Sequence, residues 1–595
     1  KYSDATSRTY LTDTKGWTIS DDGLSSDFVS TWAIPSNSYN FELPLKDYAN
    51  ITINWGDGSS NTSSTDTNMK SHTYTSAGTY TITVAVNDAA KDIGEMYLNG
   101  HASATLIRTI TNWGEGKWET FYAAFKGATN LTIPATDEPD LSLTTHMDFA
   151  FFGCSNLVGT TLNDWNTGAV IYMNRMFENA TVFNGDISSW NTSSVIRMDG
   201  MFKNAIAFNQ NISTSGSSWD VSNVTNMGNM FCACDTWPTL SAFNGSVSGW
   251  NTAAVTNMSQ MFAYSLFNKA INTSGDVWNT AAVTNMNGMF ANATAFNQDI
   301  SSWNTAAVTN MAAMFSAASA FNQNINTSGD SWNTAAVTSM SQMFSGAQTF
   351  NGNITSWNTA AVTNMHRLFE NAQAFNQNIS TSGNIWNTEK VTNMSRLFNH
   401  AHAFNENITG WNTEAVTNMA SMFWEARVFN QNISSWNTAA VTNMMDMFRS
   451  ALAFNQPLVH SGNSWNLGNV TTMVRMFTST GLSIANYNVF LYSQANNSGI
   501  KSNVTLNASS KYSDATSRTY LRDTKGWTIT DLGNQASIVP TITGTTVANN
   551  NSTIAVTFNE AVYNTSGGSG ALEVSDFALS ISGGVATVNA TPSSI

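Results

Sequence analysis

Residue types that perform acid–base or metal chemistry are sparse and widely separated in this sequence. The seven histidines are His72, His101, His146, His366, His400, His402 and His460. The closest pair, His400 and His402, has a spacing that puts the two rings on different faces of a helix, and no cysteine or carboxylate completes a zinc set. No nucleophile elbow, phosphate-binding loop or dinucleotide fingerprint is present. We therefore expect a chain that is not an enzyme and has no cofactor.

Carboxylates show no catalytic pairing. A glycosidase needs two carboxyl groups that face one cleft. Those of the central region occur irregularly, at Asp299, Glu370, Glu389, Glu414 and Glu425. Calcium binding is the remaining alternative, because this ion prefers oxygen ligands. Its candidate ligands are Asp57, Asp137, Glu138 and Asp140. We favour roles in turns for these four residues over calcium.

Only three cysteines occur, Cys154, Cys232 and Cys234, which excludes a framework of disulfides. In the repeat described next, Cys154 and Cys234 take positions where most copies have alanine. Thiols two residues apart are poorly placed for a disulfide. We therefore interpret these cysteines as small buried residues rather than as a redox or metal site.

The elements that position all these residues come from an internal repeat. Twelve tryptophans open its successive copies: Trp165, Trp190, Trp219, Trp250, Trp278, Trp303, Trp332, Trp357, Trp386, Trp411, Trp436 and Trp465. Most neighbours in this series are 25 or 29 residues apart, so the base length is 25 residues with an optional insert of four. This is the size of one supersecondary unit and not of a domain.

Residues 278–302 show which elements one repeat contains. A single apolar stripe at helical spacing predicts a helix of about three turns. The stripe consists of Met286, Met289, Phe290, Ala293 and Phe296. Thr284 or Asn285 is placed to cap the start of this helix. Trp278 and Val283 suit short strands, and their opposite parity requires a bend between them.

A repeat of this kind has one apolar side, which it buries by stacking on its neighbours. The predicted fold class is therefore multidomain α+β. It consists of a strand-plus-helix solenoid of about 12 regular repeats of 25 to 29 residues, flanked by β-sandwich domains. Columns of Trp, Val, Met and Phe form the core of the solenoid.

An asparagine follows the second phenylalanine of eleven successive repeats. These residues are Asn184, Asn209, Asn244, Asn268, Asn297, Asn322, Asn351, Asn376, Asn405, Asn430 and Asn455. A polar side chain beside an apolar column commonly bonds turn backbone that stacking would leave unpaired. We favour such a structural ladder, and a row of ligand-binding amides is the alternative that the sequence leaves open.

The four-residue inserts all lie between the isoleucine and the next tryptophan, so they emerge at one edge of the solenoid. They align Thr214, Thr273, Thr327 and Thr381. This edge is either a contact surface or a set of loose surface loops. Acceptor triplets for N-linked glycans also recur, at Asn211, Asn272, Asn326, Asn378, Asn407 and Asn432. Composition alone produces such triplets in a repeat rich in Asn, Ser and Thr.

The bulk composition limits the partners. The chain has 595 residues, of which 11% are charged and 42% are hydrophobic, and its net charge is −15. This negative charge disfavours nucleic acid and anionic membranes as partners. No apolar run reaches the roughly 18 residues of a membrane span, so we expect no membrane insertion in this segment.

The first residues of the chain occur twice. Residues 1–20 (KYSDATSRTYLTDTKGWTIS) recur at residues 511–530 with 18 of 20 positions identical. We therefore expect residues 1–22 to be a copy of the terminal cap of a preceding module, within a longer polypeptide.

The repeat also carries a family resemblance. Its motif WNTAAVTNMSQMF, followed by FNQNISSW, resembles the BspA-type leucine-rich-like repeats of bacterial surface proteins over about residues 107–530. The motif WGDGS with HTYTSAGTYTITV resembles a β-domain of the polycystic-kidney-disease (PKD) type, and the last segment resembles a bacterial Ig-like domain. The predicted boundaries are 23–100 for the PKD-like domain, 101–480 for the leucine-rich-like solenoid, 481–535 for its C-terminal cap and 536–595 for the Ig-like domain.

The resemblance implies an exported protein that is displayed at the cell surface and serves adhesion or the building of extracellular structures. We expect an extracellular structural protein, a module or subunit of a filament, stalk or fibre that is assembled end to end with other copies or modules. The alternative is a cell-surface adhesin or glycan-binding protein whose partners are glycans or host surface proteins.

Overall fold

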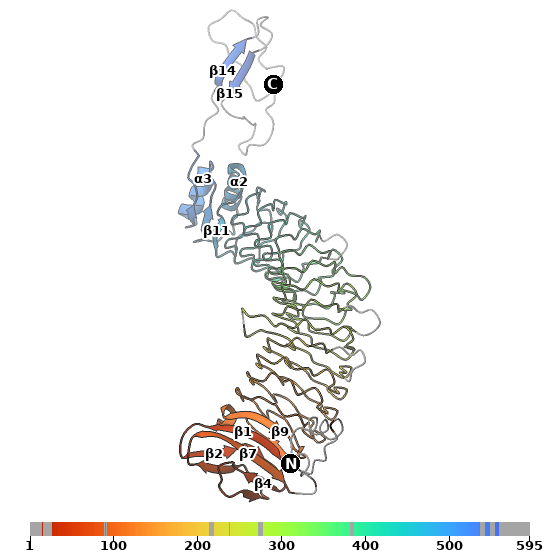
Figure 1. Cartoon of the computed structure of the whole chain (residues 1–595). Helices are drawn as coiled ribbons and strands as arrows, with labels where there is room; N and C mark the ends of the chain where they lie inside the picture. The colour runs from red at the N-terminus through yellow and green to blue at the C-terminus, as the bar shows by residue number, and fades with distance from the viewer. Residues whose placement is uncertain are drawn as a thin grey trace, which may run out of the picture. The chain divides into compact units, whose positions relative to one another are not determined.

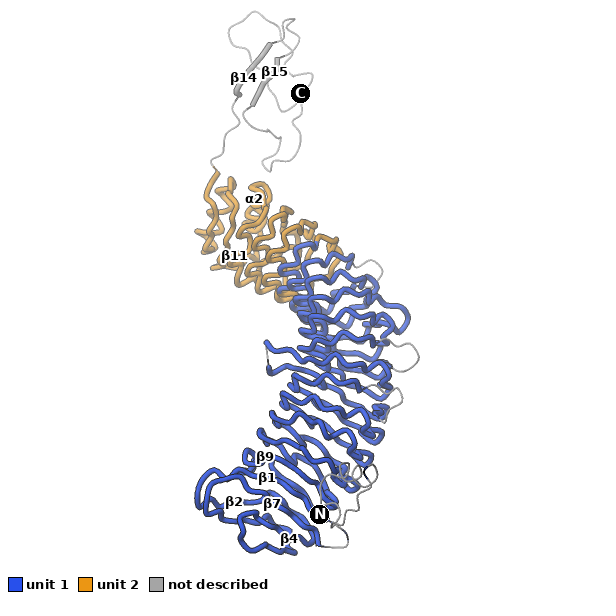
Figure 2. The backbone as a smooth tube through the Cα atoms, in the orientation of Figure 1, with its two compact units in different colours: residues 1–391, 396–404 blue, residues 392–395, 405–595 orange. Residues whose placement is uncertain are grey.

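The computed structural model describes residues 15, 26–87, 90, 92–212, 219–236, 238–271, 278–380, 386–535, 542–547 and 554–558. They belong to two compact units, residues 1–391 with 396–404 (unit 1) and residues 392–395 with 405–595 (unit 2) (Figure 2). Unit 1 starts with β-strands and continues as stacked repeats, whereas unit 2 holds the last repeats and the longest helix (Figure 1). The predicted cap copy, residues 1–22, lies outside the described residues apart from Lys15.

Unit 1 opens with a mainly antiparallel β-domain, as the alternating sequence predicts. β1 (Phe28–Ile34) alternates buried and half-buried residues, which is the pattern of a strand with one face in a core. The main sheet has the order β5-β4-β7-β1-β9 and pairs antiparallel throughout. Trp32 of β1 packs edge-on against Phe41 of a second, two-stranded sheet, β2-β6, at 5.1 Å between ring centroids. The other strands are β2 (Tyr39–Leu43), β3 (Leu45–Lys46), β4 (Ile51–Asn54), β5 (Thr62–Ser64), β6 (Lys70–Tyr74), β7 (Gly78–Val86), β8 (Asp92–Met96), β9 (Ile107–Asn112) and β10 (Lys117–Trp118).

Strand β9 belongs to both the β-domain and the repeats. Thr109 of β9 pairs antiparallel with Thr31 of β1, and it also forms a parallel bridge with Thr132 in the first repeat. Lys117 of β10 likewise pairs with β8 and bridges Asp140 in parallel. The β-domain therefore closes the first repeat through backbone hydrogen bonds, which pairs groups that an open sheet edge would leave exposed.

The predicted helix of each repeat is wrong. In residues 278–302 the backbone forms consecutive turns, in which the N–H groups of Met289 and Ala293 donate to carbonyls three residues earlier. Gly288 and Asn292 have φ values of 60° and 57°, a left-handed conformation that a right-handed helix does not contain. Asn285 does not cap a helix, because its Oδ1 accepts the N–H of Asn287 in a local turn. The described repeats thus consist of turns and short bridges, which corrects the α+β assignment.

Backbone hydrogen bonds of this turn segment run between neighbouring repeats. The N–H groups of Met286, Gly288, Phe290 and Asn292 donate to carbonyls of the next repeat over 2.6 to 3.0 Å. Every second residue takes part, as in a parallel sheet. Each repeat therefore satisfies the backbone of its neighbour, which explains how a chain with so little regular secondary structure holds a fixed conformation.

The core consists of the predicted columns. All twelve repeat tryptophans are 0 to 4% exposed, and the Val, Met and Phe columns are buried with them. Phe290 stacks on Phe296 within its repeat at 3.9 Å between centroids, and on Phe315 of the next repeat at 5.7 Å. The bend that separates Trp278 from Val283 is a turn in which Val283 N–H donates to the Thr280 carbonyl. Burial of each such aromatic side chain contributes roughly 1.5–3 kcal/mol.

Unit 2 ends its repeats with a helix and a small parallel sheet of order β11-β12-β13. Ser483 caps α2, because its Oγ accepts the N–H of Asn486. Tyr487, Phe490 and Leu491 are the buried apolar residues of this helix. The elements are β11 (Met473–Phe477), α2 (Ile484–Ala495), β12 (Thr505–Ala508), α3 (Ala515–Thr519), the π-helical turn η3 (Tyr520–Thr524) and β13 (Thr528–Thr530).

The last predicted domain is described only in part. β14 (Ile542–Val547) and β15 (Ile554–Phe558) form an antiparallel pair. The remainder of the predicted Ig-like domain, residues 536–595, lies outside the described residues.

Candidate functional surface

The asparagine column joins neighbouring repeats. In unit 1 the N–H of Asn322 donates to Oδ1 of Asn297 at 2.9 Å, and the N–H of Asn351 donates to Oδ1 of Asn322 at 2.8 Å. Gln323 adds bonds from its Nε2 to the carbonyl oxygen and Oδ1 of Asn297. The same link connects Asn184, Asn209, Asn244, Asn268, Asn297, Asn322, Asn351 and Asn376 in unit 1, and Asn405, Asn430 and Asn455 in unit 2. The side-chain oxygens of this column are thus engaged in stacking.

Two threonine columns perform a similar role and were missed by sequence reasoning. Thr334 is fully buried and donates from Oγ1 to the carbonyl of Asn358 in the next repeat at 2.8 Å. Thr338 is exposed, and both its N–H and its Oγ1 donate to the carbonyl of Thr309 in the preceding repeat. The pattern was visible in the sequence, because eight of the twelve repeats read Trp-Asn-Thr followed by Val-Thr.

Most of the repeat tryptophans also bond to an earlier repeat, whereas the indole Nε1 atoms of Trp165, Trp219 and Trp278 have no hydrogen-bond partner among the described residues. The indole Nε1 of Trp332 donates to the carbonyl of Ile300 at 2.8 Å, and that of Trp357 donates to Ile325 at 2.7 Å. Sugar-binding surfaces use exposed aromatic rings for stacking, whereas these rings lie in the core. The exposed aromatic residues among the described part of the chain are Tyr122, Tyr492 and Tyr520.

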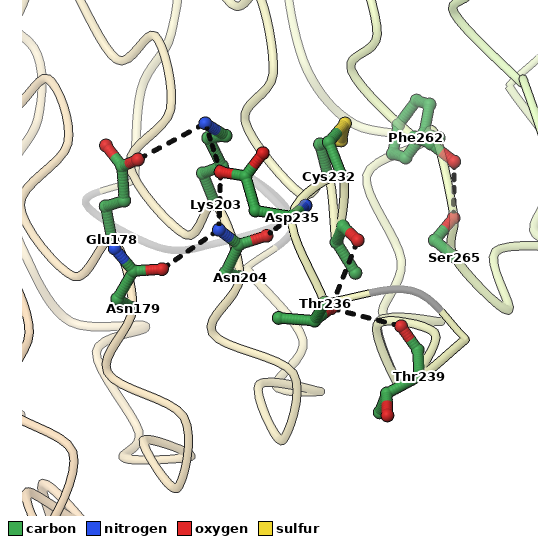
Figure 3. The surroundings of a disulfide bond; sticks show 12 residues. Glu178, Asn179, Lys203, Asn204, Cys232, Asp235, Thr236, Thr239, Phe262 and Ser265 are labelled. Atoms are coloured by element: carbon green, nitrogen blue, oxygen red, sulfur yellow. Dashed lines mark hydrogen bonds and ion pairs between the residues drawn. A yellow bond between two sulfur atoms is a disulfide. The ribbon is translucent and has the colours of Figure 1, made fainter.

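Charged residues of the repeats pair with one another. Lys203 lies 3.3 Å from Glu178 and 2.7 Å from Asp235 (Figure 3). Asn204 donates from Nδ2 to Asp235 and to Asn179. Burial alone would lower the pKa of Lys203, but the hydrogen bond with Asp235 and the charge of Glu178 outweigh it and raise the pKa. The pKa of Asp235 is lowered by the bonds from Lys203 and Asn204. These contacts therefore favour the charged forms of Lys203 and Asp235.

An open polar depression of about 520 Å³ lies on unit 1 where the left-handed turn residues of successive repeats meet. It is lined by Asn292, Ser316, Ala317, Ser345, Gly346, Glu370, Asn371 and His400. Glu370 contributes charge, but it already pairs with Arg367 at 3.3 Å and Arg396 at 3.5 Å. The depression offers hydrogen-bonding groups without an exposed aromatic ring.

The interpretation of the cysteine pair is wrong, whereas that of Cys154 is right. Cys232 and Cys234 form a disulfide with 5.3 Å between their Cα atoms (Figure 3). The N–H groups of Phe231 and Ala233 both donate to the next repeat, and the backbone held in this way brings the two cysteines within bonding reach. Cys154 is buried, and burial raises the pKa of its thiol.

The insert edge is described only in part. Thr327 donates from Oγ1 to the Trp332 carbonyl at 2.8 Å, whereas the aligned residues Thr214, Thr273 and Thr381 lie outside the described residues. Of the six predicted glycan acceptors, Asn326 is half-buried and Asn272 lies outside the described residues. The four exposed acceptors are Asn211, Asn378, Asn407 and Asn432. The side chains of Asn378, Asn407 and Asn432 make local turns by accepting the N–H two residues later, whereas that of Asn211 accepts the N–H of Ser246 at 3.0 Å.

The calcium candidates are used in turns and ion pairs. Asp57 accepts the N–H of Ser59 at 3.0 Å and lies 2.7 Å from Nε2 of His72. Burial would raise the pKa of Asp57, but these bonds outweigh it and lower the pKa to about 2. Asp137 accepts the N–H groups of both Trp113 and Gly114 at 2.8 Å.

The other candidate ligands are dispersed. Asp140 accepts the N–H of Ser142, and burial raises the pKa of Glu138. The rings of His400 and His402 are 6.1 Å apart. Within the described ranges, no three His, Cys, Asp or Glu side chains gather as metal ligands. Over the same part of the chain, every helix is too short or too polar to cross a membrane.

Comparison with protein families gives two matches. The family described as Mycoplasma protein of unknown function, DUF285, matches residues 119–243, 234–329, 326–408 and 381–490. The PKD domain matches residues 29–94, which contain β1 except its first residue, strands β2 to β7 and the start of β8. Comparison with curated proteins and with solved structures finds no match. The two matches suggest an extracellular surface protein with a repeat region.

Proposed function

Since this chain belongs to the DUF285 family through residues 119–490, next to a PKD domain, we propose that it is an extracellular structural protein. Its repeats form a solenoid of the BspA type that serves as one module of a filament, stalk or fibre assembled end to end. Its partners are other copies or modules of the same protein, and it catalyses no reaction.

One observation carries this proposal: most of the polar side chains that recur along the repeats bond to a neighbouring repeat. The side chain of Asn322 accepts the backbone N–H of Asn351. The hydroxyl of Thr334 donates to the carbonyl of Asn358, and the indole of Trp332 donates to the carbonyl of Ile300. Repetition of these residues therefore supports stacking and shape. A catalytic or ligand-binding residue would instead be expected to stand out from the repeat and to remain accessible.

Electron microscopy of the native material from its source, combined with the intact mass of the chain, tests the proposal. Long fibres with a regular axial repeat would support it, and the mass would show whether modules share one polypeptide. Discrete particles that carry no axial repeat would contradict it.

The open depression on unit 1 favours a second candidate function, an adhesin that binds glycans or a host surface protein. Its polar lining, including Asn371 and His400, supplies donors and acceptors for hydroxyl groups. A glycan array compares the chain with its Asn371→Ala variant. A saturable signal that this variant loses would place the adhesin first, and a signal that persists would exclude the depression as the binding site.

A further inference from the structure

The cap segment, residues 511–531, closes the end of unit 2 by adding a strand. β13 pairs in parallel with β12, in the register Leu506 with Ile529. Trp527 is 2% exposed, and its indole donates to the carbonyl of Lys501 at 2.8 Å. Leu521 is fully buried, and its carbonyl accepts the N–H of Trp527 at 3.0 Å. The acceptor face for these residues consists of α2 and the segment that leads into β12.

Helix α2 holds the start of the cap segment. The side chain of Asn488 accepts the N–H groups of Ser513 and Asp514 and donates to the hydroxyl of Ser513. Asp514 in turn caps α3 by accepting the N–H of Ser517 at 3.0 Å. These bonds fix the entry of the segment onto the acceptor face.

An ion pair holds the end of the cap segment. Asp531 has a side chain that is 1% exposed, and Nε of Arg518 donates to it at 2.7 Å. The hydroxyl of Tyr487, in α2, lies 3.2 Å from the same carboxylate. Between these points Gly526 has a φ of 69°, and a Cβ there would meet the side chain of Asn503 at 2.4 Å. Another residue here would have to displace Asn503 and adopt a left-handed conformation, so glycine suits this position best.

The copy at residues 1–21 retains each of these groups. Positions 1–20 repeat positions 511–530 in the same order, and Asp21 continues the match to Asp531. The groups that anchor the cap thus have counterparts of the same type at Ser3, Asp4, Arg8, Leu11, Gly16 and Trp17. The two differences are Thr12 for Arg522 and Ser20 for Thr530, and both Arg522 and Thr530 are exposed.

From this match, and resting on the proposed end-to-end assembly, we propose that residues 1–21 of one copy dock on α2 and β12 of a second copy, in the place of that copy's residues 511–531. The two segments offer the same contacts, so the exchange needs no new interface. The contact joins residues 1–21 of one copy to α2 and β12 of another, so it is a head-to-tail contact. Repeated from copy to copy without closing into a ring, it generates an open chain of modules.

A binding experiment uses the same substitution in the two copies. The acceptor is the full chain with Trp527→Ala, which weakens its own cap. The probe is a fluorescent peptide of residues 1–22. We expect this acceptor to bind the probe roughly 100-fold more tightly than the unaltered chain does, and a Trp17→Ala probe to lose that binding, because each change removes a buried tryptophan. A probe of residues 511–532 that binds while the 1–22 probe does not would overturn the proposal.

A second pair of variants covers the case in which Trp527→Ala disturbs the acceptor face. The full chain with Ser3→Cys and Asn488→Cys is oxidised and separated without reductant, because Asn488 contacts Ser513, the counterpart of Ser3. We expect covalent dimers and longer chains that largely disappear when Trp17→Ala is added. Absence of these species, or their formation regardless of Trp17→Ala, would overturn the proposal.

These experiments use purified chains, so they are independent of the microscopy of native material. Cap exchange in purified chains together with discrete native particles would contradict the proposed function alone. Native fibres together with probes that never bind would contradict the cap exchange alone.

Discussion

The backbone N–H of Asn351 donates a 2.8 Å hydrogen bond to Oδ1 of Asn322, which lies 29 residues earlier in the chain. One amide side chain per repeat thus holds the backbone of the next repeat. The following residue here is Gly352, so no glutamine reinforces this particular link.

Replacing Asn322 by Ala is expected to destabilise this interface by about 1 kcal/mol, because the N–H of Asn351 loses its acceptor. Asn322→Asp keeps an oxygen at the same place and should lose much less. Hydrogen exchange of the Asn351 amide measures the effect, with a roughly fivefold acceleration expected for Ala. Equal acceleration in the two variants would mean that Oδ1 is not the acceptor in solution.

The two threonine columns give a matched comparison within one repeat. Thr334→Val should destabilise the chain by about 1 kcal/mol, because the fully buried Thr334 hydroxyl no longer donates to the carbonyl of Asn358. Thr338→Val should cost less, since the Thr309 carbonyl also accepts the backbone N–H of Thr338 at 2.9 Å. Urea unfolding of the two variants side by side checks the order. A larger loss for Thr338→Val would be inconsistent with the contacts described.

The observed turn and the helix expected from the sequence predict opposite effects of Gly288→Ala on stability. In a helix, Gly288→Ala would stabilise by about 1 kcal/mol. In the structure Gly288 has a φ of 60°, so the same change should destabilise by about 1–2 kcal/mol.

The next repeat supplies the reciprocal control. Ala313 takes the equivalent position with a φ of 55°. Ala313→Gly should therefore be neutral or stabilising, because glycine adopts this conformation freely. Thermal unfolding of both variants measures whether each substitution raises or lowers the stability of the chain. If Gly288→Ala stabilised the chain, the result would contradict the turn and support the helix expected from the sequence.

The repeat made the core predictable, because Trp, Val, Met and Phe recur at fixed positions and only stacking buries them all. The structural role of the asparagine column could be predicted in the same way, since a polar residue beside a buried ring needs a hydrogen-bond partner. The identity of that partner could not be predicted, because it lies one repeat away.

The turn conformation could not be predicted from the apolar pattern. Met286, Met289, Phe290 and Ala293 have the spacing of a helical stripe, and two consecutive turns produce the same spacing. Left-handed residues would have revealed the turns if they were always glycine or asparagine. However, Ala313 also adopts this conformation, so left-handed positions cannot be recognised from residue type alone.

Asp57 makes the stability of the β-domain depend on pH in acid. Its pKa falls from 3.8 to about 2 on folding, so the charged form is favoured in the folded state. The stabilisation is complete above pH 3.8 and is lost as the pH falls towards 2.

Asp57→Asn should remove this part of the acid dependence while keeping an acceptor for the N–H of Ser59. His72→Gln should weaken it, because the imidazole lies 2.7 Å from the carboxylate. Denaturant unfolding between about pH 5 and pH 2, followed by fluorescence, measures the slope. An unchanged slope in Asp57→Asn would assign the dependence to other carboxyl groups.

The backbone bonds from Met286, Gly288, Phe290 and Asn292 point from one repeat to the next, so tension applied along a stack would load them repeat by repeat. Each repeat that detaches frees 25 to 29 residues. That length of chain extends to roughly 85–100 Å, so force–extension traces should show steps of this size. In the proposed structural role, such a stack would lengthen under load in increments of one repeat.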